Sequence, residues 1–157
     1  MKMNFRFAAS ALAALVLASP LAMAQQQGVS KDEITLGSIQ DLSGPLAGFG
    51  KQARLGMMLA VDEINEQGGI NGRKINFISL DDGYNPAKTV EQARKLVEEE
   101  EVLLLFGTLG TPPNSAIHKY MNQKKVPQLY VATGASKWGD PKNFPWTMGF
   151  QPDYHTE

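Results

Sequence analysis

The sequence predicts an α/β fold in which a mostly parallel sheet carries helices on both faces. Three observations support this class. Strand-like and helix-like stretches alternate three times along the chain. The run 102–106 is continuously apolar, as a strand covered on both faces is, and loops containing glycine follow the strands. The 157 residues, 43% of them hydrophobic, are enough for about one domain with right-handed crossovers between its strands.

A loop with three glycines separates the first strand from the first helix. Residues 34–39 alternate as a strand does, and the loop 41–50 follows them. A helix is expected over 51–67, because Gly68-Gly69 is a typical helix stop and apolar residues precede it at helical spacing. These residues are Leu55, Met58, Leu59, Val61 and Ile64.

The second strand and helix have clear boundary signals. A tight Asn71-Gly72 turn leads into a strand over 74–80, which the turn residues Asp81-Asp82-Gly83 close. Asn85 as N-cap and Pro86 at the first helical position then begin a helix that ends near Glu98. Its expected buried stripe is Val90, Ala93, Leu96 and Val97. The acidic run 98–101 is interpreted as a solvated face rather than a binding patch.

The last elements repeat the alternation. The strand 102–106 is expected to be central, and the loop 107–111 follows it. After Pro112-Pro113, residues 114–124 are expected to form a helix with Ile117, Tyr120 and Met121 inward. A fourth strand over 127–131, a polar stretch over 132–140 and a short apolar piece over 146–150 complete the chain.

The first 24 residues are typical of a signal peptide. Lys2 and Arg6 give a positive start, 7–18 is an apolar core, and Ala22-Met23-Ala24 is a small-x-small cleavage site. The apolar run is shorter than the ~20 residues of a spanning helix, which disfavours a membrane anchor. We therefore expect export to the periplasm with cleavage after Ala24, a flexible mature N-terminus over 25–31, and no disulfides, since the chain has no cysteine.

Nucleotide binding, nucleic-acid binding and catalysis are each disfavoured. A phosphate loop ending at Gly50-Lys51 would need glycine where Pro45 stands and a hydroxyl where Gln52 stands. A net charge of −1 without a basic cluster gives no nucleic-acid surface. The two histidines, His118 and His155, are expected at the surface and form no metal or nucleophile pair. No cofactor and no enzyme activity are expected.

Open parallel sheets bind ligands beyond the carboxyl ends of their strands, where the strand order reverses. That rule selects three loops, 41–50, 107–111 and 132–136. Each is rich in glycine or hydroxyl residues, and small residues leave backbone N–H groups at a helix N-terminus free to hold a carboxylate or other anion. The sequence therefore predicts a small-molecule site formed by these loops.

Four stretches, taken together in their order along the chain, resemble the sequences of a known family. They are ITLGSIQDLSGPLAGFGKQ, AVDEINEQGGINGRKINFISLDDGYNP, FGTLGTPPNSA and VPQLYVATGAS. Together they look like the N-terminal lobe of the periplasmic binding proteins of branched-chain amino-acid ABC importers. The resemblance covers about residues 32–157, and its most specific block is 60–86.

The resemblance implies a type I periplasmic-binding-protein lobe, one half of a two-lobed clamp that closes over a solute and delivers it to a membrane permease. Residues 32–145 would be this lobe, and 146–157 the first interlobe crossover with the truncated start of the second lobe. We interpret the sequence as a fragment or an interrupted reading frame. A periplasmic sensor of amides or aromatic acids with the same fold is the alternative to transport.

The resemblance also implies which residues bind the ligand. Phe49 matches an aromatic residue that packs against the ligand side chain, and packing of Phe49 on its own helix is the alternative. Thr111 matches a hydroxyl residue that holds the ligand carboxylate. Ala132, Thr133 and Gly134 match residues whose backbone and hydroxyl bind the ammonium and carboxylate of an amino acid. The leucine-type binders have threonine at the position of Gly134, so the hydroxyl that receives the ammonium is missing here unless Thr133 or Ser136 replaces it. The expected ligands therefore include related small carboxylates as well as amino acids.

Overall fold

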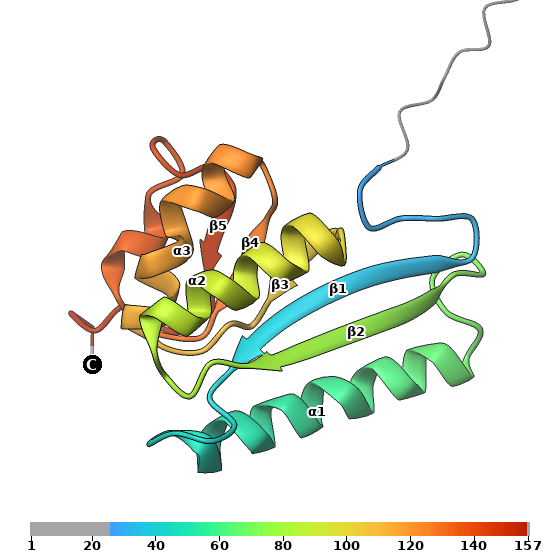
Figure 1. Ribbon diagram of the computed structural model, residues 1–157, viewed down its shortest axis with the longest axis horizontal. Coiled ribbons are helices and arrows are strands. Elements are labelled where there is room, and N and C mark those ends of the chain that lie inside the picture. The colour runs from blue at the N-terminus through green and yellow to red at the C-terminus, as the bar shows by residue number, and fades with distance from the viewer. Residues whose placement is uncertain (1–25, 157) are drawn as a thin grey trace, which may run out of the picture.

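The computed structural model describes residues 26–156, so the signal peptide expected over 1–24 lies outside the described residues. Five strands and three α-helices alternate along this part of the chain (Figure 1). Their bounds are β1 (Glu33–Gln40), α1 (Ala47–Glu66), β2 (Lys74–Asp81), α2 (Pro86–Arg94), β3 (Leu104–Phe106), α3 (Thr111–Lys124), β4 (Gln128–Val131) and β5 (Thr147–Gly149). A π-helical turn, Lys95–Glu99, continues α2, and a 3-10 turn, Ser136–Gly139, precedes β5.

All strand pairs in the sheet are parallel, and the order is β2-β1-β3-β4-β5. The predicted α/β class and the central place of β3 are confirmed. Strand β2 lies on one side of β1 and β3 lies on the other, so the direction in which successive strands are placed in the sheet reverses between β1 and β3. A ligand crevice is expected at the carboxyl ends of these two strands.

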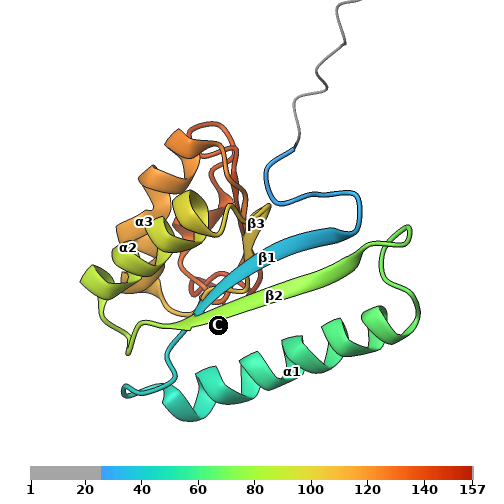
Figure 2. The ribbon, with the colours of Figure 1, turned by 45° about the vertical axis from the view of Figure 1, so that its right-hand side comes forward.

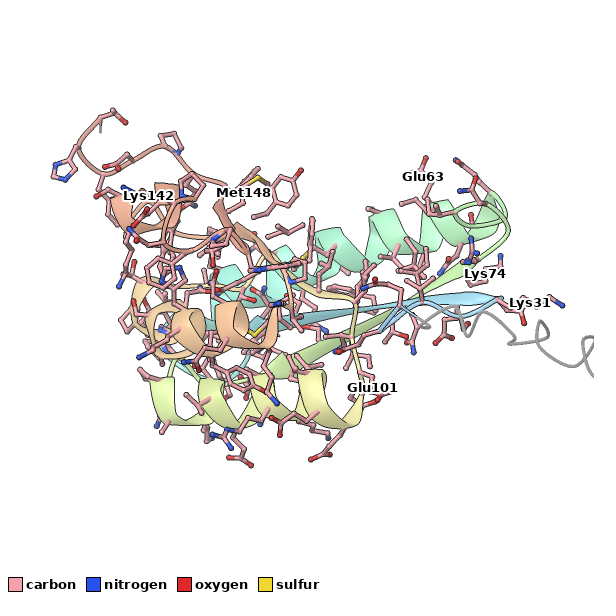
Figure 3. The ribbon with its side chains drawn as sticks, turned by 90° about the horizontal axis from the view of Figure 1, so that it is seen from above. Lys31, Glu63, Lys74, Glu101, Lys142 and Met148 are labelled. Carbon is pink, nitrogen blue, oxygen red and sulfur yellow. The ribbon has the colours of Figure 1, made fainter. Side chains whose placement is uncertain are left out.

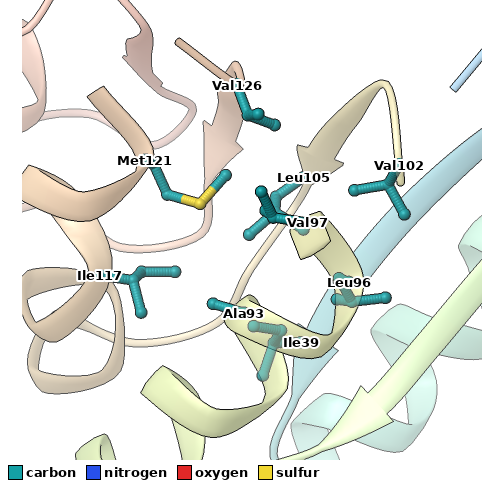
Figure 4. Packing of buried hydrophobic residues seen from close by; sticks show 9 residues of the cluster. All are labelled: Ile39, Ala93, Leu96, Val97, Val102, Leu105, Ile117, Met121 and Val126. Atoms are coloured by element: carbon teal, nitrogen blue, oxygen red, sulfur yellow. The ribbon is translucent and has the colours of Figure 1, made fainter. Parts of the chain in front are cut away.

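Helices cover both faces of the sheet. Helix α1 lies along β1 and β2 on one face, and α2 and α3 pack together on the other (Figures 1 and 2). The hydrophobic core lies between the sheet and the α2–α3 layer (Figure 4). Five of the seven residues expected to face inward on α2 and α3 belong to this core, and the other two, Val90 and Tyr120, pack against it partly buried. The core members are Ile39, Ala93, Leu96, Val97, Val102, Leu105, Ile117, Met121 and Val126.

Helix α1 begins at Ala47, four residues earlier than predicted. The carboxylate of Asp41 accepts the N–H groups of Gly44 at 2.5 Å and Leu46 at 2.6 Å. These two bonds close the loop into a tight turn, and the helix starts directly after it. Phe49 and Gly50 are therefore helical residues and not, as predicted, part of the loop.

Two further boundaries differ from the prediction. Helix α3 starts at Thr111 because Pro112 and Pro113 fit its first turn, where proline loses no helical hydrogen bond. Strand β3 starts two residues later than expected, since the N–H of Val102 donates to the carbonyl of Leu96 and so belongs to the end of the preceding helical segment. The acidic run 98–101 is exposed as predicted.

The apolar residues that identify α1 do not all face the sheet. Leu55 and Leu59 are 68% and 69% exposed, and Met58 is also exposed. The side toward the sheet instead carries smaller or more flexible residues, Ala53, Gly56, Met57, Ala60 and Val61, which line an apolar groove of about 480 Å³. Helical spacing located this helix correctly but did not distinguish its two apolar faces.

Lys31 and Lys74 lie at the end of the molecule where β1 and β2 begin, and Lys142 and Met148 lie toward its other side (Figure 3). Part of the segment 25–31 is attached to the domain, because the side-chain amide of Gln27 donates to the carbonyls of Val97 and Val102 at 3.1 Å each.

In residues 26–156, no helix has the length and apolar character needed to cross a membrane.

Candidate ligand-binding site

Three loops meet at the carboxyl edge of the sheet. They follow β1 (41–46), β3 (107–110) and β4 (132–135). Since the three strands are parallel neighbours, their carboxyl ends are adjacent, and an isolated parallel bridge between Leu109 and Ala132 continues the sheet between two of the loops. The structure thus brings together the three loops selected from the sequence.

Aspartates at the ends of β1 and β2 hold the first loop. The carboxylate of Asp81 accepts hydrogen bonds from the N–H of Leu42 at 2.8 Å, the hydroxyl of Ser43 at 2.6 Å and the N–H of Gly83 at 2.9 Å. Burial alone would raise the pKa of Asp81, but these bonds outweigh burial and lower that pKa. The interpretation of Asp81 as a turn residue is confirmed.

Asp82 follows β2 directly and is buried. Its carboxylate accepts the N–H of Tyr84 at 2.9 Å and the hydroxyl of Thr89 at 2.7 Å. Burial raises the pKa of Asp82 above its usual range, and the nearby charges of Asp41 and Asp81 raise it further. Both aspartates therefore stabilise turns, and neither carboxylate is left free to act on a ligand.

A buried amide network fixes the second loop. Asn114, in the first turn of α3, donates to the carbonyls of Thr108 and Gly110, each at 2.8 Å, and accepts from the amide of Gln128 at 2.7 Å. Gln40 at the end of β1 donates to the first carbonyl of the same loop at 2.7 Å. The three amide residues are fully buried, so this loop is held rigidly between α3 and the sheet.

Thr111 and Thr133 bring two hydroxyl groups into contact beside this loop. Their Oγ1 atoms are hydrogen-bonded to each other, and Thr133 is only 3% exposed. The N–H of Gly110 donates to the carbonyl of Ala132 at 3.2 Å, which aligns the two segments. Thr111, Ala132, Thr133 and the adjacent Gly134 thus form one cluster at the start of α3, and their contact with a ligand stays a prediction.

Phe49 is not part of this cluster. It lies in the first turn of α1, at the same edge of the sheet, with 54% of its surface exposed. An exposed ring at this edge is available to a ligand or to another polypeptide segment. Its contact with a ligand stays a prediction.

A pocket of about 300 Å³ opens next to the hydroxyl cluster. Thr133, Gly134 and Ser136 form one wall, and Trp138, Met148 and Asp153 contribute to the others. The pocket combines hydroxyl groups with an apolar wall, the composition expected where a small amphipathic solute binds.

Sequence reasoning missed the residues that position this site. Gln40 and Gln128 are polar residues within otherwise apolar strands, and Asn114 follows two prolines at a helix start. An amide residue within an apolar strand or at a helix start is expected to be buried and hydrogen-bonded, and this pattern could have identified the three residues from the sequence. Tyr154 was missed too, and its hydroxyl lies 2.8 Å from Thr133 Oγ1.

His118 is buried, so its expected place at the surface was wrong. It is 6% exposed, its ring stacks on Phe144 with 3.9 Å between centroids, and Trp138 packs edge-on at 5.0 Å. Burial lowers the pKa of His118; the charge of Lys137 lowers it further, and that of Asp140 opposes this. His155 is exposed as predicted. Among residues 26–156, no three His, Asp or Glu side chains gather where they could hold a metal ion.

Several known proteins are similar to this chain in both sequence and fold. Leu/Ile/Val-binding protein homolog 7 of Brucella suis is 36% identical over 126 residues, which are 80% of this chain and 31% of that protein. The crystal structure of a possible leucine/isoleucine/valine-binding protein from Rhodopirellula baltica is 31% identical with a TM-score of 0.72, covering 78% of this chain and 32% of the other. Branched-chain amino acid substrate-binding protein LivJ from Streptococcus pneumoniae, in complex with isoleucine, is 27% identical with a TM-score of 0.70, covering 78% and 34%.

The chain spans about a third of the length of these proteins. Residues 33–156 match the family described as periplasmic binding protein, which is most of the chain. The parallel sheet with helices on both faces is the fold of one lobe of such a protein. The chain therefore belongs to the periplasmic binding protein family.

Proposed function

We propose that this chain is part of the solute-binding component of an ABC importer. It captures a branched-chain or other hydrophobic amino acid, or a related small carboxylate, in the periplasm and delivers it to a membrane permease. The observation that carries the proposal is the paired hydroxyls of Thr111 and Thr133 at the start of α3, beside a pocket with an apolar wall. The amino-acid-binding names of the relatives support the same class of ligand.

The chemistry of the site suits a carboxylate. The N-terminus of α3 carries a partial positive charge, and Thr111 is its first residue, so its N–H and hydroxyl can both donate to an anion. Ala132 and Thr133 are held opposite by the sheet hydrogen bonds of the loop after β4. The carbonyl of Ala132 has a second lone pair for an ammonium group.

Isothermal titration calorimetry of the purified full chain tests this proposal. L-leucine, L-isoleucine, L-valine and benzoate are titrated into the wild type and into Thr111→Val, which keeps the shape of the side chain but removes its hydroxyl. We expect binding of at least one carboxylate by the wild type and a loss of about tenfold or more in Thr111→Val, since hydrogen bonds to charged groups contribute about 1.5–3 kcal/mol.

The matched control is Thr35→Val, the same substitution on β1 toward the opposite end of the sheet, where the Thr35 hydroxyl donates to the exposed Glu33 side chain. It should bind as the wild type does. Equal affinities in all three proteins would show that the ligand binds elsewhere, and no binding of any carboxylate would refute the proposed function.

The choice between transport and sensing needs a different observation. Both roles use the same ligand site, so binding measurements do not separate them. Genes for a permease and an ATPase next to this one would support transport, whereas a neighbouring kinase gene would support the sensor.

A further inference from the structure

Tyr154 lies directly against the proposed site, although it is 21 residues away from Thr133 in the sequence. Its phenol oxygen is 2.8 Å from Thr133 Oγ1, and its backbone N–H donates to the carbonyl of Gly134 at 2.8 Å. The hydroxyl contacts therefore run in a chain from Thr111 to Thr133 to Tyr154. These two anchors fix the position of the tyrosine relative to the loop after β4.

The ring of Tyr154 can take this position only because residue 134 is glycine. A Cβ atom at Gly134 would lie 2.6 Å from both Cδ1 and Cε1 of the ring and 2.5 Å from the carbonyl oxygen of Pro152. Any other residue there would push the ring or the chain away. The absence of a side chain at 134, which left the expected site without one hydroxyl, is thus what admits the phenol.

The site needs hydroxyl donors because backbone donors are scarce around it. Two of the first three residues of α3, Pro112 and Pro113, have no N–H group. The N–H of Asn114 donates to Gly110, and that of Thr133 donates to Val131. An anion at the start of α3 therefore depends on hydroxyl groups more than an anion at an ordinary helix N-terminus does.

We propose that Tyr154 is a ligand-binding residue whose phenol completes a site of three hydroxyls, with Thr111 and Thr133, for the carboxylate of the solute. This inference rests on the proposed function and adds a residue to its site. A hydroxyl can donate or accept, so the chain of contacts between the three groups can reorient and direct donors toward an anion that arrives. Because Tyr154 is 54% exposed, its ring can also cover one side of the bound solute.

The variant Tyr154→Phe tests the phenol without removing the ring. Its affinity for L-leucine, L-isoleucine and benzoate is measured by calorimetry on the full chain. We expect a loss of about tenfold or more for each carboxylate that the wild type binds, as for the loss of a hydrogen bond to a charged group. L-leucinamide, which has no carboxylate, should be affected much less, and a purely structural role of Tyr154 would not produce that difference.

The matched control is Tyr120→Phe, which removes a phenol that bonds to Glu98 on the far side of α3 and should leave affinity unchanged. Gly134→Ala provides a second test, since its Cβ displaces the ring, and it should weaken carboxylate binding as Tyr154→Phe does. If Gly134→Ala does not fold, Tyr154→Phe alone decides the question.

A failure of this inference can be distinguished from a failure of the proposed function. If the wild type binds a carboxylate and Tyr154→Phe binds it equally well, the role of Tyr154 is refuted and the proposed function stands. If the wild type binds none of the probes, both are refuted. An equal loss for L-leucine and L-leucinamide would also refute the carboxylate contact.

Discussion

His118 is a buried titratable residue in the middle of α3, enclosed by the rings of Phe144 and Trp138. Its Nε2 atom is buried without a hydrogen-bond partner in the described part of the chain. A buried, unpaired imidazole favours its neutral form, so protonation works against folding.

The pH dependence of stability follows from this. Because burial lowers the pKa of His118 in the folded state below its ordinary value of 6.5, the unfolded state binds more protons in that range. The free energy of unfolding should therefore fall as the pH decreases below about 6.5. His118→Phe keeps the stacking and removes the titration, so urea unfolding between pH 5 and 7.5 should show a flatter profile for the variant. Identical profiles would contradict this assignment.

Phe49 allows a second test at the residue scale. Its ring is 54% exposed, so Phe49→Ala should change the free energy of unfolding little. If the ring contacts the ligand, affinity should fall by about three- to tenfold, the usual contribution of an aromatic contact. Calorimetry and urea unfolding of the same variant separate the two effects, and unchanged affinity would remove Phe49 from the site.

At the scale of elements, the loop after β3 depends on the first turn of α3. The amide of Asn114 is the link, since it bonds to two carbonyls of the loop and to Gln128 of β4. We expect Asn114→Ala to lower the free energy of unfolding by about 2–4 kcal/mol, because it leaves several buried polar groups unpaired.

Urea unfolding measures this loss, and Gln123→Ala, at an exposed position of the same helix, is its control. The Asn114 variant should also bind its solute more weakly, since Thr111 is the next residue after the loop. A variant as stable as the control would show that the amide network does not hold the loop.

Several elements could be predicted from sequence because their signals are local. Asn85 and Pro86 begin α2 as expected, and the side chain of Asn85 accepts the N–H groups of Ala87 and Lys88. The start of α1 could not be predicted, because it depends on how the carboxylate of Asp41 folds back on its own loop. The three candidate loops could be selected from the sequence because each follows a predicted strand and is rich in glycine or hydroxyl residues, whereas Tyr154 comes from a contact between distant segments that no local pattern encodes.

At the scale of the whole molecule, large apolar side chains are exposed on α1, on β4 and just after β5. Leu55 and Leu59 are largely exposed on α1, and Tyr130 and Phe150 are exposed with ring centroids 6.0 Å apart. Exposed apolar residues in this number favour self-association. The carboxyl edge with its hydroxyl groups is distinct from this surface in composition.

This surface gives a prediction about solubility. Replacing Leu55 and Leu59 with lysine removes apolar area that is already exposed, so each change should alter the free energy of unfolding by less than about 0.5 kcal/mol. Light scattering at increasing protein concentration should show less association in the double variant than in the wild type. Equal association of the two proteins would show that α1 does not mediate it.

Binding of a small carboxylate between the loops after β3 and β4, at the carboxyl edge of the sheet, can be observed residue by residue in a two-dimensional ¹H–¹⁵N NMR titration of the full chain with L-leucine and with benzoate. We expect one of these compounds to shift the amide signals of Thr111, Thr133, Gly134 and Tyr154, while those of Lys31 and Lys74 at the opposite end stay in place. Shifts confined to the opposite end or to the groove beside α1, or no shifts with either compound, would contradict it.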